Sequence, residues 1–243
     1  MNKILITGGT GQFGRAAVEF LLKKGILCSQ ISALVKDGNK ALDLKEKGVS
    51  IIEGNYNDYC SLLNAFNGIH KLLFISSSDM VNRIFQHENV VKAAKEAGVK
   101  HIIYTSSERK SENEESPLSF VSDSHIATEN AIKKSRMAYT IMRNNLYMDM
   151  LPWFLGENIL ETGIFFPAGE GKVRFILRSE MAEVAANILI TNNHENKEYY
   201  ISGTTPVSFE QIAGILSEIT SKPINYNSTD YQDYVETIEE RYY

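Results

Sequence analysis

Short apolar runs alternate along most of the chain with longer segments whose apolar residues recur at helical spacing. The apolar runs predict strands at residues 4–6, 30–35, 49–54, 71–75, 101–105, 139–143 and 198–201. The helically spaced segments predict helices at residues 16–22, 40–47, 59–66, 82–97, 123–134 and 178–190. This alternation is typical of an α/β fold, a doubly wound parallel sheet with helices on both faces.

The alternation loosens after residue 150, where aromatic residues and prolines gather. Pro152-Trp153-Phe154 and residues 164–167 suit a pocket lid or a second lobe. Ser208 and Gln211 form a capping-box pattern, which predicts one more helix. We therefore expect a core at residues 1–150 and a small C-terminal α/β substrate lobe at residues 151–243. The charged segment 108–116 is interpreted as a solvated loop without catalytic weight.

A glycine-rich turn follows the first predicted strand and opens the first helix, as a dinucleotide-binding fingerprint requires. Gly8 allows a tight turn, Gly11 a close approach of a pyrophosphate, and Gly14 close packing of helix on strand. The glycines are spaced three and three, not two and three, so an ordinary turn stays the alternative. The candidate cofactor-binding residues here are Gly8, Thr10, Gly11, Gln12, Phe13, Gly14 and Arg15.

The end of the second strand distinguishes the two nicotinamide dinucleotides. An acidic residue there holds a ribose 2′-hydroxyl, whereas a cation accommodates a 2′-phosphate. Lys36 favours NADP(H), with Arg15 as a second partner for the phosphate, while Asp37 keeps NAD(H) open. Surface solvation of both cations is the plainer alternative. The residues expected beneath the cofactor, or in a helix-capping turn, are Ser76, Ser77 and Ser78.

Composition narrows the function classes. The net charge is −5 and Lys/Arg residues form no long run, which argues against a nucleic-acid partner. The two cysteines, Cys28 and Cys60, have no metal-ligand spacing and predict reduced thiols in a cytoplasmic protein. The first apolar run ends at glycines after a few residues, so we expect neither a signal peptide nor membrane insertion.

Several stretches together resemble the NmrA-like branch of the atypical short-chain dehydrogenases, with the nearest likeness to bacterial NAD(P)H:quinone oxidoreductases and with triphenylmethane reductase as a relative. The resemblance extends over nearly the whole chain. It implies a Rossmann-like fold, NADPH as cofactor and reduction of quinones, and it adds Thr105 and Ser106 to the cofactor candidates. The matching stretches are residues 6–14, 71–78, 94–100, 104–106, 125–129 and 143–147.

Two departures from that family bear on function. Lys36 stands where family members have an arginine; a lysine keeps the charge but loses the bidentate fork. Family members usually extend a few dozen residues beyond the position of Tyr243. We therefore expect an acceptor pocket that is smaller, more open, or completed by a partner subunit, and a homodimer stays open.

The chain lacks the Tyr-x-x-x-Lys acid of typical short-chain dehydrogenases. Tyr139 has Arg143 at that spacing, which we interpret as chance within a core strand. Reduction of a ketone needs a positioned acid, whereas a quinone yields a hydroquinone anion with a pKa of about 10, by comparison with tyrosine, and can take its proton from water. His125 and Tyr147 are the candidate polar contacts to the acceptor; a surface histidine and a core aromatic are the alternatives. The aromatic candidates for stacking on a planar acceptor, with a place in the core as the alternative, are Trp153, Phe154, Phe165 and Phe166.

Three functions remain. The first is an NAD(P)H-dependent oxidoreductase that transfers a hydride to a quinone. The second is a catalytically silent NADP(H)-binding redox sensor that acts through a protein partner. The third is a reductase of another flat acceptor, such as a dye, a nitro compound or an azo compound. The sequence favours the first.

Overall fold

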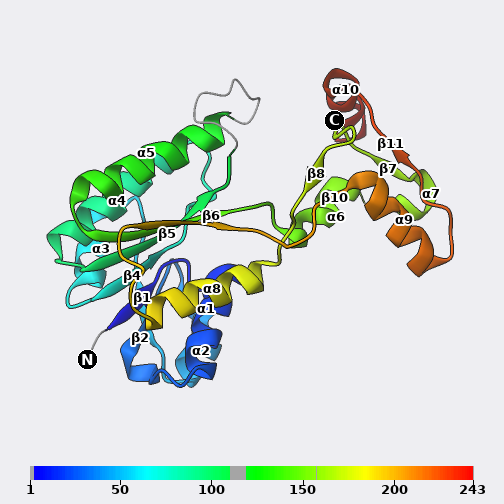
Figure 1. Ribbon diagram of the computed structural model, residues 1–243. Helices are drawn as coiled ribbons and strands as arrows, with labels where there is room; N and C mark the ends of the chain where they lie inside the picture. The colour runs from blue at the N-terminus through cyan, green and yellow to red at the C-terminus, as the bar shows by residue number, and fades with distance from the viewer. Residues whose placement is uncertain (1–2, 110–118, 157, 243) are drawn as a thin grey trace. The chain divides into compact units, whose positions relative to one another are not determined.

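The computed structural model describes residues 3–109, 119–156 and 158–242, which form two compact units (Figure 1). Unit 1 comprises Met1–Asn144 and Arg178–Ile201, and unit 2 comprises Asn145–Leu177 and Ser202–Tyr243. Residues 110–116 of the predicted charged loop at 108–116 lie outside the described residues. Among the described residues, no helix has both the length and the apolar character that a membrane crossing requires.

Unit 1 is built on a seven-stranded parallel sheet in the order β3-β2-β1-β4-β5-β6-β9. The strand order reverses between β1 and β4, which confirms the predicted doubly wound fold. Ligands of such sheets bind beyond the carboxyl ends of the strands at this reversal. The strands are β1 (Ile4–Ile6), β2 (Ile31–Val35), β3 (Ser50–Glu53), β4 (Lys71–Phe74), β5 (His101–Ser107), β6 (Ala138–Asn144) and β9 (Lys197–Ile201).

Helices cover both faces of this sheet (Figure 1). One face carries α3 (Tyr59–Phe66), α4 (Arg83–Glu96) and α5 (Ser119–Ser135), and the other carries α1 (Gln12–Lys23) and α8 (Arg178–Ile190). Three short helices lie in the connections around β2. They are η1 (Cys28–Gln30), η2 (Gly38–Ala41) and α2 (Leu42–Glu46).

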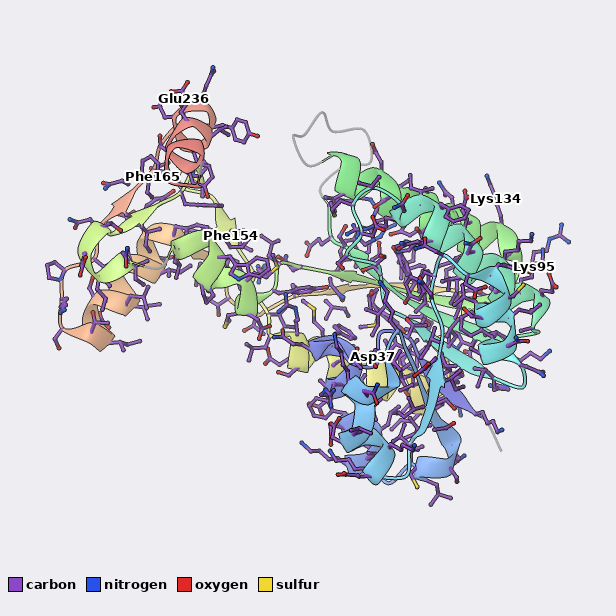
Figure 2. All side chains as sticks on the ribbon, turned by 180° about the vertical axis from the view of Figure 1, so that it is seen from behind. Asp37, Lys95, Lys134, Phe154, Phe165 and Glu236 are labelled. Carbon is purple, nitrogen blue, oxygen red and sulfur yellow. The ribbon has the colours of Figure 1, made fainter. Side chains whose placement is uncertain are left out.

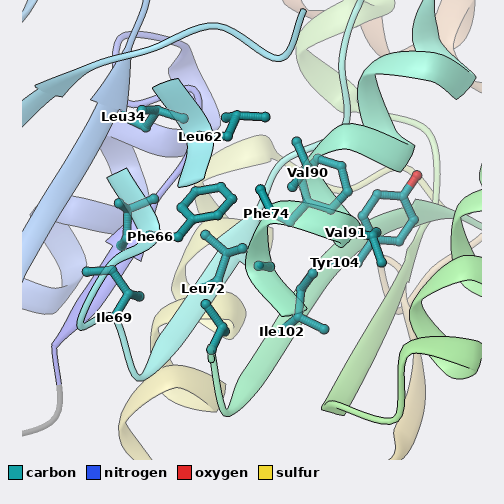
Figure 3. Close-up of a cluster of buried hydrophobic side chains, with 14 of the residues drawn as sticks. Leu34, Leu62, Phe66, Ile69, Leu72, Phe74, Val90, Val91, Ile102 and Tyr104 are labelled. Carbon is teal, nitrogen blue, oxygen red and sulfur yellow. The ribbon is translucent and has the colours of Figure 1, made fainter. Parts of the chain in front are cut away.

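The core beneath α3, α4 and α5 forms because alternate strand residues face the same side of the sheet. Leu72 and Phe74 of β4 and Ile102 and Tyr104 of β5 are fully buried against these helices (Figure 3). Each such aliphatic or Phe side chain contributes about 1.5–3 kcal/mol to folding when it leaves water. Tyr104 differs from its neighbours because it carries a hydroxyl into this apolar layer, so it needs a hydrogen-bond partner there.

A buried cation joins the sheet to its last helix. Lys71, at the start of β4, donates from Nζ to the carbonyl oxygens of Leu189 (2.8 Å) and Thr191 (3.2 Å). These carbonyls belong to the C-terminal end of α8 and the residues just after it, where a positive charge is favourable. Lys71 therefore holds a helix from late in the sequence against a strand from early in the sequence.

Unit 2 has two small two-stranded sheets and its own apolar core. In these sheets, β7 (Ile164–Phe165) pairs with β11 (Tyr226–Asn227), and β8 (Lys172–Val173) pairs with β10 (Val207–Ser208). The predicted capping box at Ser208 and Gln211 is confirmed at the start of α9. The helices are η3 (Met148–Met150), α6 (Leu151–Leu155), α7 (Ile159–Thr162), α9 (Phe209–Thr220) and α10 (Tyr231–Tyr242).

The division into units differs from a single boundary at residue 150. Helix α8 packs on α1, and β9 pairs with β6 at the edge of the main sheet, so the segment Arg178–Ile201 returns to unit 1. Sequence order concealed this return, because a strand at the sheet edge can come from any later part of the chain. That unit 2 binds the substrate stays a prediction.

Close packing at Gly14 provides the first test of this fold. A Cβ at Gly14 would lie 2.3 Å from the carbonyl oxygen of Gly8, so we expect Gly14→Ala to lower the free energy of unfolding by about 1–3 kcal/mol. Urea denaturation followed by circular dichroism measures the change. The control is Gly214→Ala in α9, where a Cβ meets nothing within 4 Å; there we expect a gain of up to about 1 kcal/mol. Equal midpoints for the two variants would contradict the packing role.

Candidate functional site

The predicted glycine turn is present between β1 and α1. Gly8 adopts φ +60°, in the left-handed region, directly after β1. Its carbonyl oxygen accepts a hydrogen bond from the backbone N–H of Gly11 (2.9 Å), which closes the turn. Helix α1 then begins at Gln12, and no side chain caps its first turn. The turn and the uncapped helix start lie at the carboxyl edge of the sheet, where the strand order reverses.

The uncapped start of α1 can bind an anion. The first N–H groups of a helix have no intrahelical acceptor and carry the positive end of the helix dipole. Phe13 is 6% exposed and belongs to the core, and the side chain of Gln12 accepts a hydrogen bond from Arg178 (2.6 Å). These two residues therefore offer a phosphate their backbone N–H groups. Thr10 lies half-buried in the turn itself.

Gly9 has a role that the glycine spacing did not indicate. A Cβ there would lie 2.7 Å from the Cβ of Ala33 in β2. The turn therefore passes directly over the neighbouring strand. The backbone N–H of Gly9 donates to the carbonyl oxygen of Leu34 in that strand (3.0 Å). Only the structure reveals this contact, because Ala33 and Leu34 are distant in sequence.

Thr7 fixes the spacing between the two strands beneath the turn. Its hydroxyl accepts the backbone N–H of Ile75 (2.9 Å) at the end of β4. Tyr56 donates to the carbonyl oxygen of Ile75 (2.8 Å), and its hydroxyl lies 2.5 Å from that of Thr7. A three-residue network thus holds the carboxyl ends of β1 and β4 together where the cofactor is expected.

The charged residues near the end of β2 differ in whether their side chains already form ion pairs or hydrogen bonds within the protein. Lys36 is exposed and makes no ion pair within the described part of the chain. Arg15 is paired with Asp43, whose pKa this contact lowers, and also donates to the carbonyl oxygen of Lys40 (2.9 Å). Asp37 caps η2 through the N–H of Asn39 (3.0 Å; Figure 2 labels Asp37). Of the three predicted residues, Lys36 is the one whose charge is left for a 2′-phosphate.

The serines after β4 form a braced loop. Thr105 accepts the N–H of Ser76 (2.9 Å) across from β5. Ser77 donates from its hydroxyl to Gln86 (2.5 Å) and from its N–H to Nε2 of His87 (2.9 Å), both in α4. Ser78 is exposed. The hydroxyls of Ser77 and Thr105 are therefore used to shape the loop, and Ser78 is the serine that leaves its hydroxyl at the surface.

His125 is buried, so the alternative of a surface histidine is wrong. It is 5% exposed, and its Nδ1 lies 2.7 Å from the hydroxyl of Tyr104. Burial, followed by the positive charge of Arg83, lowers the pKa of His125 to about 4. The histidine is consequently neutral near pH 7 and acts there as a hydrogen-bonding group, not as a cationic acid.

A buried ion-pair network closes the carboxyl ends of β5 and β6. Glu129 of α5 binds Arg109 through both carboxylate oxygens (2.9 Å each) and Arg143 through one (2.9 Å). Ser106 donates its hydroxyl to the same carboxylate (2.5 Å). The hydroxyl of Ser106 is thus engaged by Glu129, and the side chain of Arg109 is 5% exposed although we had expected a solvated loop there. Arg143 also reaches Glu198 of β9 (2.8 Å).

Tyr147 and the predicted aromatic group belong to unit 2. Tyr147 is half-buried and forms a backbone bridge to Ile176. Phe166 stacks on Phe209 at 4.6 Å between ring centroids and also contacts Phe154, so both predicted rings pack in the unit 2 core (Phe154 is labelled in Figure 2). Trp153, in contrast, is 80% exposed.

Sequence reasoning missed Arg83, His87 and Tyr104. Arg83 and His87 are four residues apart and therefore lie on one face of α4, which was a usable signal. Tyr104 read as an ordinary core residue because its strand is apolar throughout. Its contact with His125 depends on α5 packing over β5, which no sequence spacing shows.

The ion-pair network gives a second test. Burial opposes ionisation of Glu129, but hydrogen bonds from Arg109, Arg143 and Ser106 prevail and lower its pKa to about 2 from an ordinary 4.5. We expect Glu129→Gln to lower the free energy of unfolding at pH 7 by about 3–5 kcal/mol, because two buried guanidinium groups lose their counter-charge.

Because the folded-state pKa is depressed, this stabilisation is complete above pH 4.5 and is lost as the pH falls toward 2. Urea titrations of both proteins at several pH values should therefore converge at low pH. Glu88→Gln, on the exposed surface of α4, is the control and should change stability by less than about 0.5 kcal/mol. A difference that persists at pH 2 would contradict the assignment.

Comparison with known proteins confirms the resemblance. Quinone oxidoreductase 2 of Escherichia coli strain K12 is 37% identical over 234 residues, covering 95% of this chain and 79% of the relative. The NAD(P)H azoreductase of Xenophilus azovorans is 30% identical over 226 residues, covering 92% and 76%.

Solved structures share the fold. Citrobacter sp. triphenylmethane reductase in complex with NADP(H) matches with a TM-score of 0.88 at 36% identity, covering 99% of this chain and 84% of that one. The NADPH-dependent quinone oxidoreductase of Escherichia coli in complex with NADPH matches with a TM-score of 0.89 at 34% identity, covering 99% and 83%. The model of the NmrA-like family matches residues 1–243, and this chain therefore belongs to the NmrA-like family.

Proposed function

We propose that this protein is an NAD(P)H-dependent oxidoreductase that transfers a hydride to a quinone or a similarly flat acceptor. The observation that carries the proposal is the uncapped start of α1 beneath the Gly8 turn, at the reversal of strand order. Relatives that match nearly the whole chain bear the names quinone oxidoreductase and azoreductase, which supports the same reaction class.

The residues present fit NADP(H) as the preferred cofactor. The pyrophosphate would meet the N–H groups at the start of α1, where the glycines leave room for it. Lys36 would hold the 2′-phosphate, while Asp37 is occupied as a cap and gives NAD(H) weaker support. The loop from Ser76 to Ser78 and Thr105 would form the floor beneath the bound dinucleotide. When bound, the reduced dinucleotide supplies the hydride.

The acceptor class follows from what the chain lacks. No Tyr-x-x-x-Lys pair is present to protonate an alkoxide, so ketone reduction has no acid. A quinone accepts the hydride and leaves a hydroquinone anion, which takes its proton from water. With a pKa of about 4, His125 is neutral near pH 7 and would contact the acceptor oxygen as a hydrogen-bond partner. Tyr147 remains a second candidate contact, in unit 2.

Two further attributes belong to this proposal. The cysteines Cys28 and Cys60 are both free, which supports a reducing compartment, and we place the reaction in the cytoplasm. A homodimer that completes the acceptor pocket stays a prediction, with sedimentation as its test.

The function is tested by the absorbance of NADPH, and separately of NADH, after a small quinone is added to the pure protein. We expect rapid oxidation with NADPH preferred. Tight NADPH binding in calorimetry without oxidation of any quinone would overturn the enzyme and favour the silent sensor, whose partner a pull-down would then identify. Faster turnover of an azo compound or a dye than of quinones would assign the third function.

The cofactor preference is tested by Lys36→Ala. Loss of one charge-assisted contact of about 1.5–3 kcal/mol should raise the Kd for NADPH about 10- to 100-fold and leave the Kd for NADH unchanged. Calorimetry with both dinucleotides measures this. Lys95→Ala, an exposed lysine in the last turn of α4, serves as the control and should alter neither Kd (Figure 2). An unchanged NADPH preference in Lys36→Ala would discard the role.

A further inference from the structure

Arg83 is a buried cation that forms no ion pair with the described residues of the protein. It is the first residue of α4 and is 8% exposed. Within the described residues, its guanidinium finds one acceptor, the sulfur of Met80 (3.1 Å). Its Nε is buried and has no hydrogen-bond partner. A thioether is a weak acceptor, so a group made for carboxylates and oxyanions is left unsatisfied.

The position of Arg83 makes this arrangement more costly. The first turn of a helix carries the positive end of the dipole, and α4 has no acidic residue there to compensate. Asp79, the nearest acidic residue in sequence, is taken up by the N–H groups of Val81 and Asn82 and by the side chain of Gln86. A buried charge without a partner lowers the stability of the folded protein, and such charges occur mainly at functional sites.

The groups around Arg83 do not supply a negative charge. Its positive charge acts on His87, His125 and Tyr104, which places all four residues together at the carboxyl end of the sheet. Burial, with smaller contributions from His125 and Arg83, lowers the pKa of His87 to about 3, and burial raises that of Tyr104. These three neighbours are therefore neutral near pH 7, and no ion pair within the described residues engages the guanidinium.

Hydrogen bonding fixes the proton positions in this cluster. The N–H of Ser77 must donate to Nε2 of His87, so the His87 proton lies on Nδ1, 2.8 Å from the hydroxyl of Thr128. Tyr104 cannot donate to that protonated nitrogen and instead donates to Nδ1 of His125 (2.7 Å). His125 therefore carries its proton on Nε2, where no hydrogen bond within the described chain engages it.

We propose that Arg83, together with the Nε2–H of His125, binds the oxygen of the acceptor and stabilises the negative charge that forms there during reduction. The inference rests on the proposed reductase function and names the groups that receive the acceptor. NADPH would be the reductant: a C–H bond of its nicotinamide ring would break to leave NADP⁺, the hydride would form a new bond to the acceptor, and a proton from solvent would neutralise the charge on the acceptor oxygen. Donors fixed in place for such a charge act mainly on the transition state.

Apolar side chains beside Arg83 fit the rest of a flat acceptor. Val81 is 91% exposed, Phe85 is 56% exposed, and Ile84 is 45% exposed. They adjoin the cation in the loop after β4 and the first turn of α4. A planar ring with one electron-rich oxygen would match both features, because its ring can pack on the apolar side chains and its oxygen can bind the cation.

The test replaces Arg83 by Met, which removes the charge and keeps an unbranched side chain, and by Lys, which keeps the charge. We expect Arg83→Met to lower kcat with a small quinone about 100- to 1,000-fold while the Kd for NADPH is unchanged. Arg83→Lys should restore part of the rate. The control is Lys92→Met on the exposed surface of the same helix, which should leave kcat unchanged.

Stability separates a functional from a structural role. An uncompensated charge costs stability, so Arg83→Met should melt at the same temperature as the unaltered protein or about 2–4 °C higher. A lower melting temperature together with an unchanged kcat would overturn the proposal. A rise in the Kd for NADPH that accounts for the whole loss of rate would also overturn it, because Arg83 would then serve the cofactor.

A binding probe keeps this inference distinct from the proposed function. 4-Nitrophenol, whose phenol and phenolate forms absorb differently, is titrated with pH in the presence of the NADP⁺-loaded protein, where no reduction occurs. We expect the unaltered protein to lower the pKa of the bound phenol and Arg83→Met not to do so. If the unaltered protein lowers this pKa but reduces no acceptor, the oxyanion site is supported and the reductase function is rejected. If the titrations of the unaltered protein and Arg83→Met are identical, the oxyanion site is rejected.

Discussion

The close approach of Gly14 to the carbonyl oxygen of Gly8 is the constraint on which the rest of unit 1 depends. A side chain at Gly14 would meet that oxygen and separate α1 from β1, and a side chain at the neighbouring Gly9 would meet Ala33 of β2. The same contact leaves the first turn of α1 open toward the carboxyl edge of the sheet, because no side chain is available to cap it. The packing of α1 and the proposed anion site therefore depend on one backbone geometry.

Two buried arginine environments show how charge is distributed at that edge. Around Glu129, two guanidinium groups share one carboxylate, and the serine beside it completes the hydrogen bonding. In this network the guanidinium groups have a carboxylate as counter-charge, and the ion pairs hold β5, β6 and α5 together. Around Arg83, the neighbours are neutral and the guanidinium has a sulfur as its acceptor. The charges around Glu129 therefore support the fold, whereas the charge of Arg83 is left available to a ligand.

Much of the fold was accessible from the sequence because it depends on local signals. Apolar runs and stop signals located most elements, and α3 and α8 have the predicted bounds. The turn at Gly8 was predictable because glycine adopts left-handed backbone conformations more readily than other residues. The site was less accessible. Arg15 pairs with Asp43 and Ser106 with Glu129 through contacts between distant segments, and such contacts decide which polar groups remain for a ligand. Arg83 could not be singled out before its lack of a counter-charge was visible.

The return of Arg178–Ile201 to unit 1 has a consequence for the order in which the protein folds. Strand β9 closes the edge of β6, and α8 is held by Lys71, yet both follow the whole of residues 145–177. On the ribosome, the growing chain therefore carries a sheet with an open edge strand until synthesis passes residue 201. Open edges can pair with other chains, so the nascent protein is exposed to such misassembly during this interval.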